Sequence, residues 1–147
     1  MGITIKSPEE QDLMRVAGRL TADVLDMIGA HVQPGVTTDE LDQICHSYIV
    51  ETQKAIPAPL NYRGFPKSIC TSPNHVVCHG IPGEKKLRSG DIVNIDITVI
   101  KDGFHVKVHI SFRICGLLPP KINGRAISCS AGPYIKILFN GFSFVVT

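Results

Sequence analysis

The sequence has no acidic residue after Asp102, although it runs to 147 residues and contains 13 acidic residues in all. Residues 1–105 hold these 13 acids together with 10 basic residues, so their net charge is −3. Residues 106–147 hold five basic residues and no acid, which gives a net charge of +5. This break in charge indicates two kinds of sequence, so we expect a globular part over residues 1–105 and a divergent basic tail over residues 106–147.

Other features are missing, and each absence narrows the class of protein. No apolar run approaches the roughly 20 residues that cross a bilayer, and the first ten residues lack the basic start and apolar core of a signal peptide. The five cysteines are odd in number and lack the spacing of a disulfide framework, which favours reduced thiols and a cytoplasmic protein. A net charge of +2 does not by itself imply a nucleic-acid partner. The chain is also too short for two well-buried domains.

The first part begins with the signals of a long helix. Ser7 precedes Pro8 and stands three residues before Glu10, which is a capping box with proline at the first helical position. Apolar residues then recur at helical spacing as far as Ile28, and Pro34-Gly35 ends the segment.

A second capping box and a series of turns organise the rest of the first part. Thr37 with Glu40 begins another helix, and residues 56–66 form a loop that contains three prolines and a glycine. After the loop we expect four strands, at residues 68–71, 75–79 and 91–100 and from residue 104 onward. Helices followed by an antiparallel meander predict an α+β fold.

The dipeptide Asp102-Gly103 is typical of a two-residue hairpin turn and sets the register of the strands around it. That register places Asp96 opposite His109 and Thr98 opposite Lys107. Because side chains alternate along a strand, these residues share one face, while the intervening apolar residues face the helices.

Asp96 is unusual, because strands are depleted of aspartate and an unpaired buried carboxylate is costly. Two interpretations stay open from the residues alone. Asp96 is either a partly exposed side chain on a polar face, paired with a cation, or a metal ligand, since hard divalent ions favour carboxylates held on rigid strands.

Four motifs follow one another in the first part: Asn61-Tyr-Arg-Gly-Phe-Pro-Lys-Ser-Ile-Cys70, Val77-Cys-His-Gly-Ile-Pro82, Gly90-Asp-Ile-Val-Asn-Ile-Asp-Ile-Thr98 and Asp102-Gly-Phe-His105. Their order and spacing resemble those of type I methionine aminopeptidase, from about residue 3 to residue 105. The resemblance covers a little less than half of that family's catalytic domain.

The resemblance implies the N-terminal half of a pita-bread fold, in which two similar α+β halves surround two divalent metal ions. Cobalt, manganese, iron, zinc and nickel are the candidate ions. The implied reaction is metal-dependent removal of the initiator methionine from nascent polypeptides with a small second residue. The implied partner is the nascent peptide N-terminus, at the ribosome, and we expect a monomer with no membrane or specific nucleic-acid partner.

The resemblance also implies roles for individual residues. Asp96 matches the first metal-ligand aspartate, and His79 matches the catalytic histidine that contacts the substrate beside the scissile bond. Tyr62, Phe65 and Cys70 match positions that line the pocket for the methionine side chain. Without the resemblance, His79 is interpreted as a strand-end histidine, and the aromatic residues as ordinary loop packing.

The sequence departs from the family after His105. The family continues with Gly-Asp-Thr-Ser, whereas this chain reads Val106-Lys-Val-His109, so Lys107 stands where the family has a bridging aspartate. The hairpin register puts Lys107 diagonally across from Asp96, where its ammonium competes with a metal ion. His109, directly opposite Asp96, is an alternative second ligand, although two ligands make a weak site.

The other ligands that the resemblance implies, a histidine and two glutamates, are absent, because the tail has no acid and no histidine after His109. We expect that a shifted reading frame or a premature truncation accounts for the tail, the alternative being a diverged but folded segment. Residues 134–139 and 142–146 of the tail favour β structure and aggregation.

The sequence therefore predicts an incomplete and impaired methionine aminopeptidase. The alternative is a non-catalytic truncated relative that binds peptide N-termini or a protein partner through residues 62–70. A second chain that supplies the missing half is a further option. An RNA or ribosome anchor in the tail is disfavoured, because its five basic residues are not clustered.

Overall fold

The structure is a computed structural model that describes residues 5–114, 121–122, 125–126, 135–139 and 142–146. Helix α1 (Pro8–Gly29) begins as predicted, because the Ser7 side chain accepts a hydrogen bond from the N–H of Glu10 and the Glu10 carboxylate accepts one from the N–H of Ser7. The helix ends at Gly29, before Pro34-Gly35, because residues 30–31 form a turn.

Helix α2 (Thr38–Ser47) begins at the second predicted capping box, in which both hydrogen bonds between Thr37 and Glu40 are present. The helix continues as one π-helical turn (Tyr48–Thr52). The segment predicted as a loop then contains a two-residue strand, β1 (Ile56–Pro57), and a 3-10 turn (Tyr62–Gly64).

The centre of the fold is an antiparallel four-stranded sheet. Strand β3 (Ile92–Lys101) pairs along its whole length with β4 (Phe104–Arg113), and its other edge pairs with β1 and with β2 (Cys70–Pro73). The predicted register is confirmed, with Asp96 opposite His109 and Thr98 opposite Lys107. Asp102 and Gly103 form the turn with φ of 50° and 82°, the positive values that a two-residue hairpin requires.

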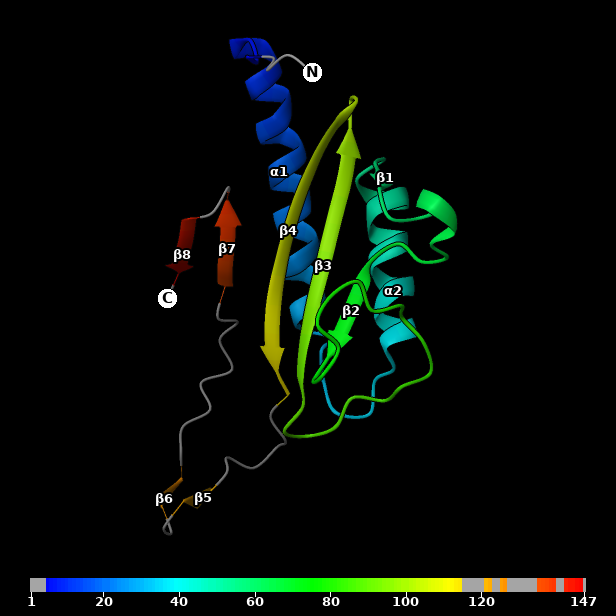
Figure 1. Cartoon of the computed structure of the whole chain (residues 1–147), viewed down its shortest axis with the longest axis vertical. Coiled ribbons are helices and arrows are strands. Elements are labelled where there is room, and N and C mark those ends of the chain that lie inside the picture. Colours follow the sequence, from blue (N-terminus) through cyan, green and yellow to red (C-terminus); the bar gives the residue numbers. More distant parts are fainter. Residues whose placement is uncertain (1–4, 115–120, 123–124, 127–134, 140–141, 147) are drawn as a thin grey trace.

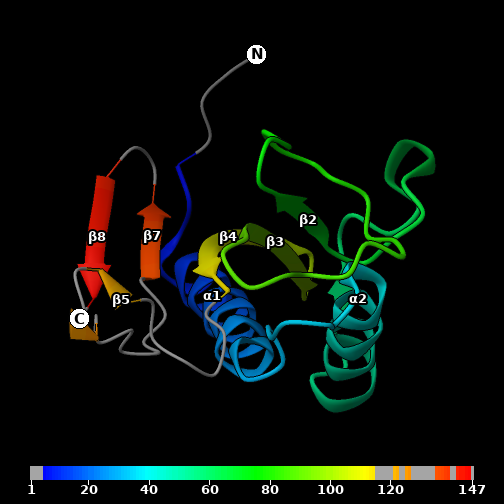
Figure 2. The same cartoon turned by 90° about the horizontal axis from the view of Figure 1, so that it is seen from below.

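The helices and the longest loop lie on opposite sides of this sheet. In Figure 1, α1 lies behind β3 and β4, and α2 lies behind β2. Figure 2 shows that the segment between β2 and β3 rises on the side of the sheet away from the helices. The fold is therefore α+β, as the sequence predicts, with one apolar and one polar sheet face.

The apolar face of β3 and β4 packs against α1 and α2 as the hairpin register requires. Eight strand side chains on this face are buried, and they alternate with exposed or half-buried residues, most of which are polar. The eight buried residues are Val93, Ile95, Ile97, Val99, Val106, Val108, Ile110 and Phe112. Thr21 joins the two layers, because its hydroxyl donates to the carbonyl oxygens of Ala17 in its own helix and of Val106 in β4. The core comprises chiefly Ala17, Val24, Ile28, Leu41, Cys45, Ile49, Ile69, Leu87, Val93, Ile95, Ile97, Val99, Val108 and Ile110.

The strand predicted at residues 75–79 is wrong. The chain leaves the sheet after Pro73, because Asn74 has φ of 54° and both its backbone N–H and its side-chain oxygen bond to the backbone of Ile92. A second positive φ, 51° at His79, turns the chain again before Gly80. Two left-handed residues within one short segment are incompatible with an extended strand.

Two further hairpins lie in the tail. β5 (Lys121–Ile122) pairs with β6 (Arg125–Ala126), and β7 (Ile135–Phe139) pairs with β8 (Phe142–Val146). The predicted β preference of residues 135–139 and 142–146 is thus confirmed, while residue 134 lies outside the described residues. Within the described ranges, no helix is both long and apolar enough to span a bilayer.

Candidate functional site

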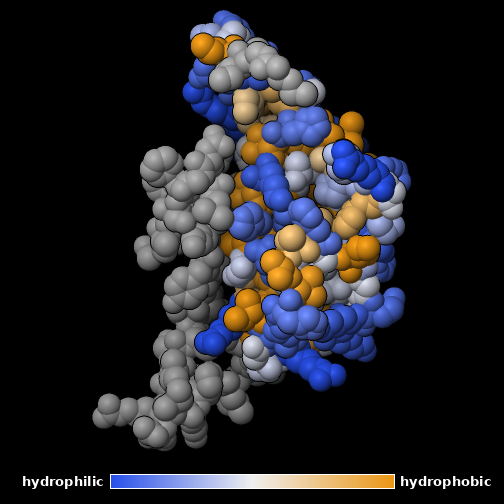
Figure 3. Space-filling model, in the orientation of Figure 1, coloured by the Kyte–Doolittle hydropathy of each residue, from blue (hydrophilic) through white to orange (hydrophobic). Residues whose placement is uncertain are grey.

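The polar face of β3 gathers the candidate metal residue and its neighbours. Asp96 lies mid-strand, with Cys70 of β2 opposite it on one side and His109 of β4 opposite it on the other. Asn94 and Thr98 flank it on the same face, and all three β3 side chains are half-buried. Figure 3 shows hydrophilic residues over this part of the molecule, in the orientation of Figure 1.

Asp96 forms an ion pair with Lys107. The Lys107 Nζ lies 2.6 Å from Asp96 Oδ2, and the Asp96 side chain is 13% exposed whereas that of Lys107 is 49% exposed. Lys107 starts opposite Thr98, two residues along β3, so its long side chain covers the diagonal to reach the carboxylate. The predicted ion pair is therefore present, and its carboxylate is more deeply buried than its lysine.

His109 has another partner although it stands directly opposite Asp96. The Nδ1 of His109 lies 3.3 Å from the amide nitrogen of Asn94, and the same amide donates to the carbonyl oxygen of Ile110 and the hydroxyl of Ser111. The structure thus places His109 in a network with Asn94, which does not support the alternative in which His109 replaces the missing aspartate as the second ligand beside Asp96.

Cys70 is buried at the start of β2, beside Asp96. Burial raises the pKa of its thiol to about 11, and the nearby negative charge of Asp96 adds to this effect. The thiol is therefore protonated near neutral pH. In this form Cys70 contributes an apolar wall to the polar face and not a thiolate ligand.

His79 lies on the segment between β2 and β3 and is exposed. Its position depends on Gly80, whose N–H donates to the hydroxyl of Ser72 at 3.2 Å and whose carbonyl accepts from the N–H of Thr71 at 2.9 Å. These two bonds hold the segment against β2. His79 itself has a left-handed backbone, is exposed and follows no strand directly, so it is not a strand-end residue.

Tyr62 and Phe65 lie in the short turn that follows β1. The backbone there closes on itself, since the N–H of Asn61 donates to the carbonyl of Phe65 and the N–H of Phe65 donates to that of Tyr62. Tyr62 is 64% exposed, with the guanidinium of Arg63 5.5 Å from its ring centre, and Phe65 is half-buried. Among the described residues, no hydrogen bond or ion pair joins either ring to Asp96.

The structure therefore brings together some predicted residues and leaves others apart. Pairing places Asp96, Cys70 and Lys107 side by side on three adjacent strands. His79 is tied to the same strand as Cys70 through Gly80. The turn that holds Tyr62 and Phe65 follows a segment attached further along β3, where the N–H of Ala58 donates to the carbonyl of Thr98.

Sequence reasoning missed Asp42, which positions the start of β2. Its carboxylate accepts hydrogen bonds from the N–H groups of Ser68 and Ile69 at 2.8 and 3.0 Å, and Asp42 is 5% exposed. Burial raises the pKa of this carboxyl, although the two hydrogen bonds oppose that effect. The sequence could have indicated this role, because Asp42 lies beside Leu41 on the apolar face of α2, where a charged residue needs a partner.

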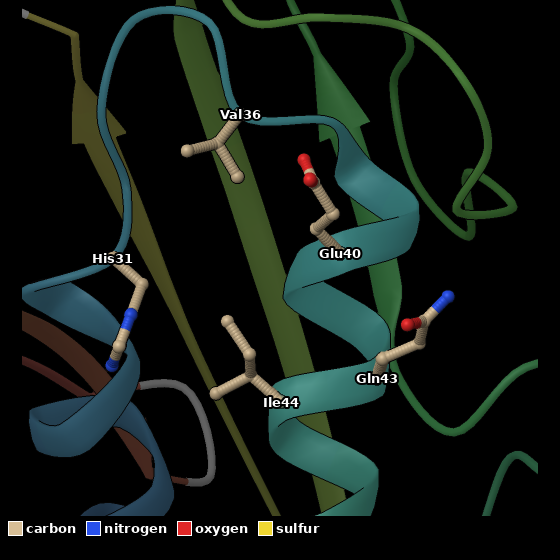
Figure 4. Close-up of a pocket in the computed structure, with 5 residues that line it drawn as sticks. All are labelled: His31, Val36, Glu40, Gln43 and Ile44. Carbon is tan, nitrogen blue, oxygen red and sulfur yellow. The ribbon is translucent and has the colours of Figure 1, made fainter.

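A hollow of about 260 Å³ opens on the helical side of the molecule, between the end of α1 and α2. Figure 4 shows its walls, which are formed by His31, Val36, Glu40, Gln43 and Ile44. The Glu40 carboxylate already caps α2 through Thr37. The hollow includes none of the predicted site residues and lies across the sheet from Asp96.

The sequence profile of metallopeptidase family M24 matches residues 12–127, most of the chain. This chain belongs to family M24. The profile extends beyond residue 105, where the stronger resemblance ends. The M24 assignment agrees with the resemblance predicted from the four motifs and implies that the family's chemistry uses divalent metal.

Within M24, the chain is similar to curated methionine aminopeptidases. The chain is 63% identical over 106 residues to a methionine aminopeptidase of Escherichia coli and 61% identical over 105 residues to one of Rickettsia prowazekii. These matches cover 71% and 70% of this chain. The chain spans about 40% of the length of either relative.

Solved structures show the same fold. The chain superposes on methionine aminopeptidase from Rickettsia prowazekii with a TM-score of 0.76 and 53% identity, over 78% of this chain and 46% of that one. It superposes on the enzyme from Thermotoga maritima with a TM-score of 0.74 and 29% identity, over the same shares. Aminopeptidase P of Escherichia coli, at 24% identity and a TM-score of 0.63, shares the fold alone. The predicted N-terminal part of a pita-bread fold is thereby confirmed.

The described residues of this M24 chain do not fit a divalent metal ion. Within residues 5–114 and the described tail strands, no three His, Cys, Asp or Glu side chains lie close enough together to hold one. Asp96, the carboxylate at the expected position, has an ammonium on one of its oxygens. The family uses divalent metal, but the described side chains of this chain do not form a site for such an ion.

Proposed function

We propose that this chain is the N-terminal part of a methionine aminopeptidase and, as its sequence stands, an impaired form of that enzyme. The complete reaction is metal-dependent hydrolysis that removes the initiator methionine from a nascent polypeptide with a small second residue. The observation that carries the proposal is the 63% identity over 106 residues to a methionine aminopeptidase.

In this proposal each site residue keeps its place in the ancestral enzyme. Asp96 stands at the position of the ancestral metal-ligand carboxylate, and His79 at that of the catalytic histidine that donates a hydrogen bond at the scissile peptide. Tyr62, Phe65 and Cys70 line the pocket for the methionine side chain. The buried, protonated thiol of Cys70 supports an apolar wall there, as a thioether substrate requires.

Impairment is supported by the ion pair of Asp96 with Lys107 and by the lack of a three-ligand cluster among the described residues. A single carboxylate that already has a cationic partner is a poor ligand for cobalt, manganese, iron, zinc or nickel.

The division of the chain belongs to the same proposal. Residues 1–105 are the aminopeptidase part, and residues 106–147 are a divergent basic tail that follows a change of reading frame. The test is to translate the gene in its other two frames past codon 105. A Gly-Asp-Thr-Ser sequence directly after that codon is expected, and its absence from both frames would overturn the proposed frame change.

The cellular setting follows from the proposed reaction. The substrate is the N-terminus of a nascent peptide, which places the protein in the cytoplasm beside the ribosome, as a monomer without a membrane or nucleic-acid partner. Reduced thiols suit that compartment, since Cys45, Cys70 and Cys78 are all free.

The function is tested by the release of free methionine from a Met-Gly-led tripeptide by the purified chain. The reaction is run with added cobalt, manganese or iron, beside the Asp96→Ala variant and the whole Escherichia coli enzyme. We expect release far below that of the whole enzyme and, where it is measurable, lost in Asp96→Ala.

Other outcomes each contradict a part of the proposal. Release equal to that of the whole enzyme would contradict impairment, and release unchanged by Asp96→Ala would contradict the site assignment. Binding of the tripeptide without any release, measured by shifts of amide resonances in residues 62–70, would favour the non-catalytic relative that binds peptide N-termini.

A further inference from the structure

We propose that Lys107 is a built-in counter-cation for Asp96, whose ammonium takes the carboxylate oxygen that a divalent ion would bind and so closes this site to metal. The inference deepens the proposed function, on which its meaning for catalysis rests. Its tests, however, measure only metal binding and stability.

The first support is the geometry of the pair. Nζ of Lys107 lies 2.6 Å from Asp96 Oδ2, the distance of a strong charge-assisted hydrogen bond. A divalent ion on the same oxygen would lie about 2.0–2.6 Å from it. Two cations would then meet within a few ångströms over one nearly buried carboxylate, so one of them must leave.

The second support is that Lys107 is held close to Asp96 by the backbone. Strands β3 and β4 pair without a break from Ile92 opposite Arg113 to Lys101 opposite Phe104. Thr98 opposite Lys107 fixes the lysine two residues from Asp96 on the same face. The ammonium therefore stays within reach of the carboxylate at little cost in chain entropy, whereas an ion must bind from solution.

The third support is that a competing metal ion would find too few further protein ligands beside Asp96. His109 is engaged with Asn94. No acidic side chain is on β4, and among the described residues no cluster of three metal-ligating side chains exists. A metal ion would have a single carboxylate as its protein ligand, which is too few to displace a neighbouring ammonium.

Metal binding is tested with Mn²⁺, whose unpaired electrons broaden the resonances of nearby amides. Wild-type chain is compared with Asp96→Asn, Lys107→Asp and the double variant Asp96→Asn/Lys107→Asp. We expect wild type to show no broadening in residues 94–98 and 105–109 beyond that of Asp96→Asn. Lys107→Asp removes the ammonium and adds a carboxylate on the diagonal, so broadening centred on both strands is expected, and lost in the double variant.

Either of two results would overturn the inference. Broadening in wild type that Asp96→Asn removes would show that the carboxylate binds metal despite Lys107. No broadening in folded Lys107→Asp would show that the ammonium is not what excludes the ion. Neither result bears on methionine release, so the proposed function is tested separately.

A stability measurement keeps the inference testable if Lys107→Asp does not fold. Lys107→Met removes the charge but keeps the length of the side chain, and we expect it to lower Tm by about 5 °C because Asp96 loses its cation. Lys107→Arg is expected to keep most of the stability. In an Asp96→Asn background, Lys107→Met is expected to change Tm by less than about 1 °C.

Arg113→Met is the matched control, because Arg113 is an exposed cation on the same face of β4 and forms no ion pair in the described part of the chain. Its Tm is expected to stay near that of wild type. If Lys107→Met lowers Tm equally in the wild-type and the Asp96→Asn backgrounds, Lys107 is not the counter-cation of Asp96.

Discussion

Gly80 lies directly against the backbone of Thr71: a Cβ at position 80 would stand 2.1 Å from the Thr71 carbonyl oxygen. The same two residues are joined by a hydrogen bond from the N–H of Thr71 to the carbonyl of Gly80. Only glycine allows this approach, and the approach places His79 beside β2. A backbone contact thus decides where the candidate catalytic histidine stands.

Gly80→Ala is expected to destabilise the chain by about 1–3 kcal/mol, because the added methyl group overlaps backbone that cannot rotate away. Urea unfolding gives the free energy, and faster amide exchange at Thr71 reports the separation of the segment from β2. Gly83→Ala is the control, since no atom lies within 4 Å of a Cβ there. Equal stability of the two variants would contradict the contact.

Asp42→Ala is expected to cost about 3 kcal/mol, because the N–H groups of Ser68 and Ile69 would be left buried without an acceptor. Asp42→Asn keeps a carbonyl oxygen at the same place and removes the buried charge, so we expect a loss of about 1 kcal/mol or less. Urea unfolding of the two variants measures the difference. If Asn is as damaging as Ala, the hydrogen bonds are not the role of this side chain.

Stability is expected to fall as the pH drops below about 4.5, through loss of the helix caps. Hydrogen bonds from the backbone N–H of Thr37 and from its side chain lower the pKa of Glu40 below its usual value of 4.5, and the N–H of Ser7 does the same for Glu10. A lowered folded-state pKa means that the stabilisation is present above 4.5 and is lost as the pH falls through the lower folded value.

Glu40→Gln tests this dependence, because glutamine still accepts the hydrogen bond from Thr37 but does not titrate. Tm is measured from pH 7 to pH 3, and the fall below pH 4.5 is expected to be smaller in Glu40→Gln. Glu51→Gln is the control, since Glu51 is exposed and forms no hydrogen bond or ion pair within residues 5–114. Parallel pH curves for all three proteins would disprove the role of the cap.

Alkylation is expected to modify Cys78 well before Cys70 in the folded chain at pH 8. Cys78 is exposed, whereas Cys70 is buried and burial raises its pKa to about 11, so little of it is the reactive thiolate. Mass spectrometry of peptides after timed iodoacetamide treatment measures both rates, with urea-unfolded protein as the control. Equal rates in the folded chain would contradict the burial of Cys70 in β2.

Gly103→Ala is expected to destabilise the hairpin by about 1 kcal/mol, because φ is 82° and alanine is strained there. Asp102→Gly, at the neighbouring turn position with φ of 50°, is expected to be neutral or slightly stabilising. Urea unfolding of both variants is the measurement. A loss in Asp102→Gly larger than that in Gly103→Ala would contradict the two-residue turn.

The sequence by itself determined the local elements and the register of the central hairpin. Both capping boxes, the turn at Asp102-Gly103 and the pairing of Asp96 with His109 depend on residues close together in the chain. The four motifs also identified the family, since each keeps its residue order along the chain. Short-range rules are sufficient for features of this kind.

The tertiary structure alone decided where the segment between β2 and β3 goes and which charges meet. Apolar residues around Val77 favour a strand, but the backbone of Ile92 binds Asn74 and turns the chain away. Asp42 was overlooked because its partners, Ser68 and Ile69, lie 26 and 27 residues further along the chain. The register placed Lys107 within reach of Asp96. The ion pair itself depends on the fold, because the fold removes the Asp96 carboxylate from water and leaves the Lys107 ammonium as its counter-ion.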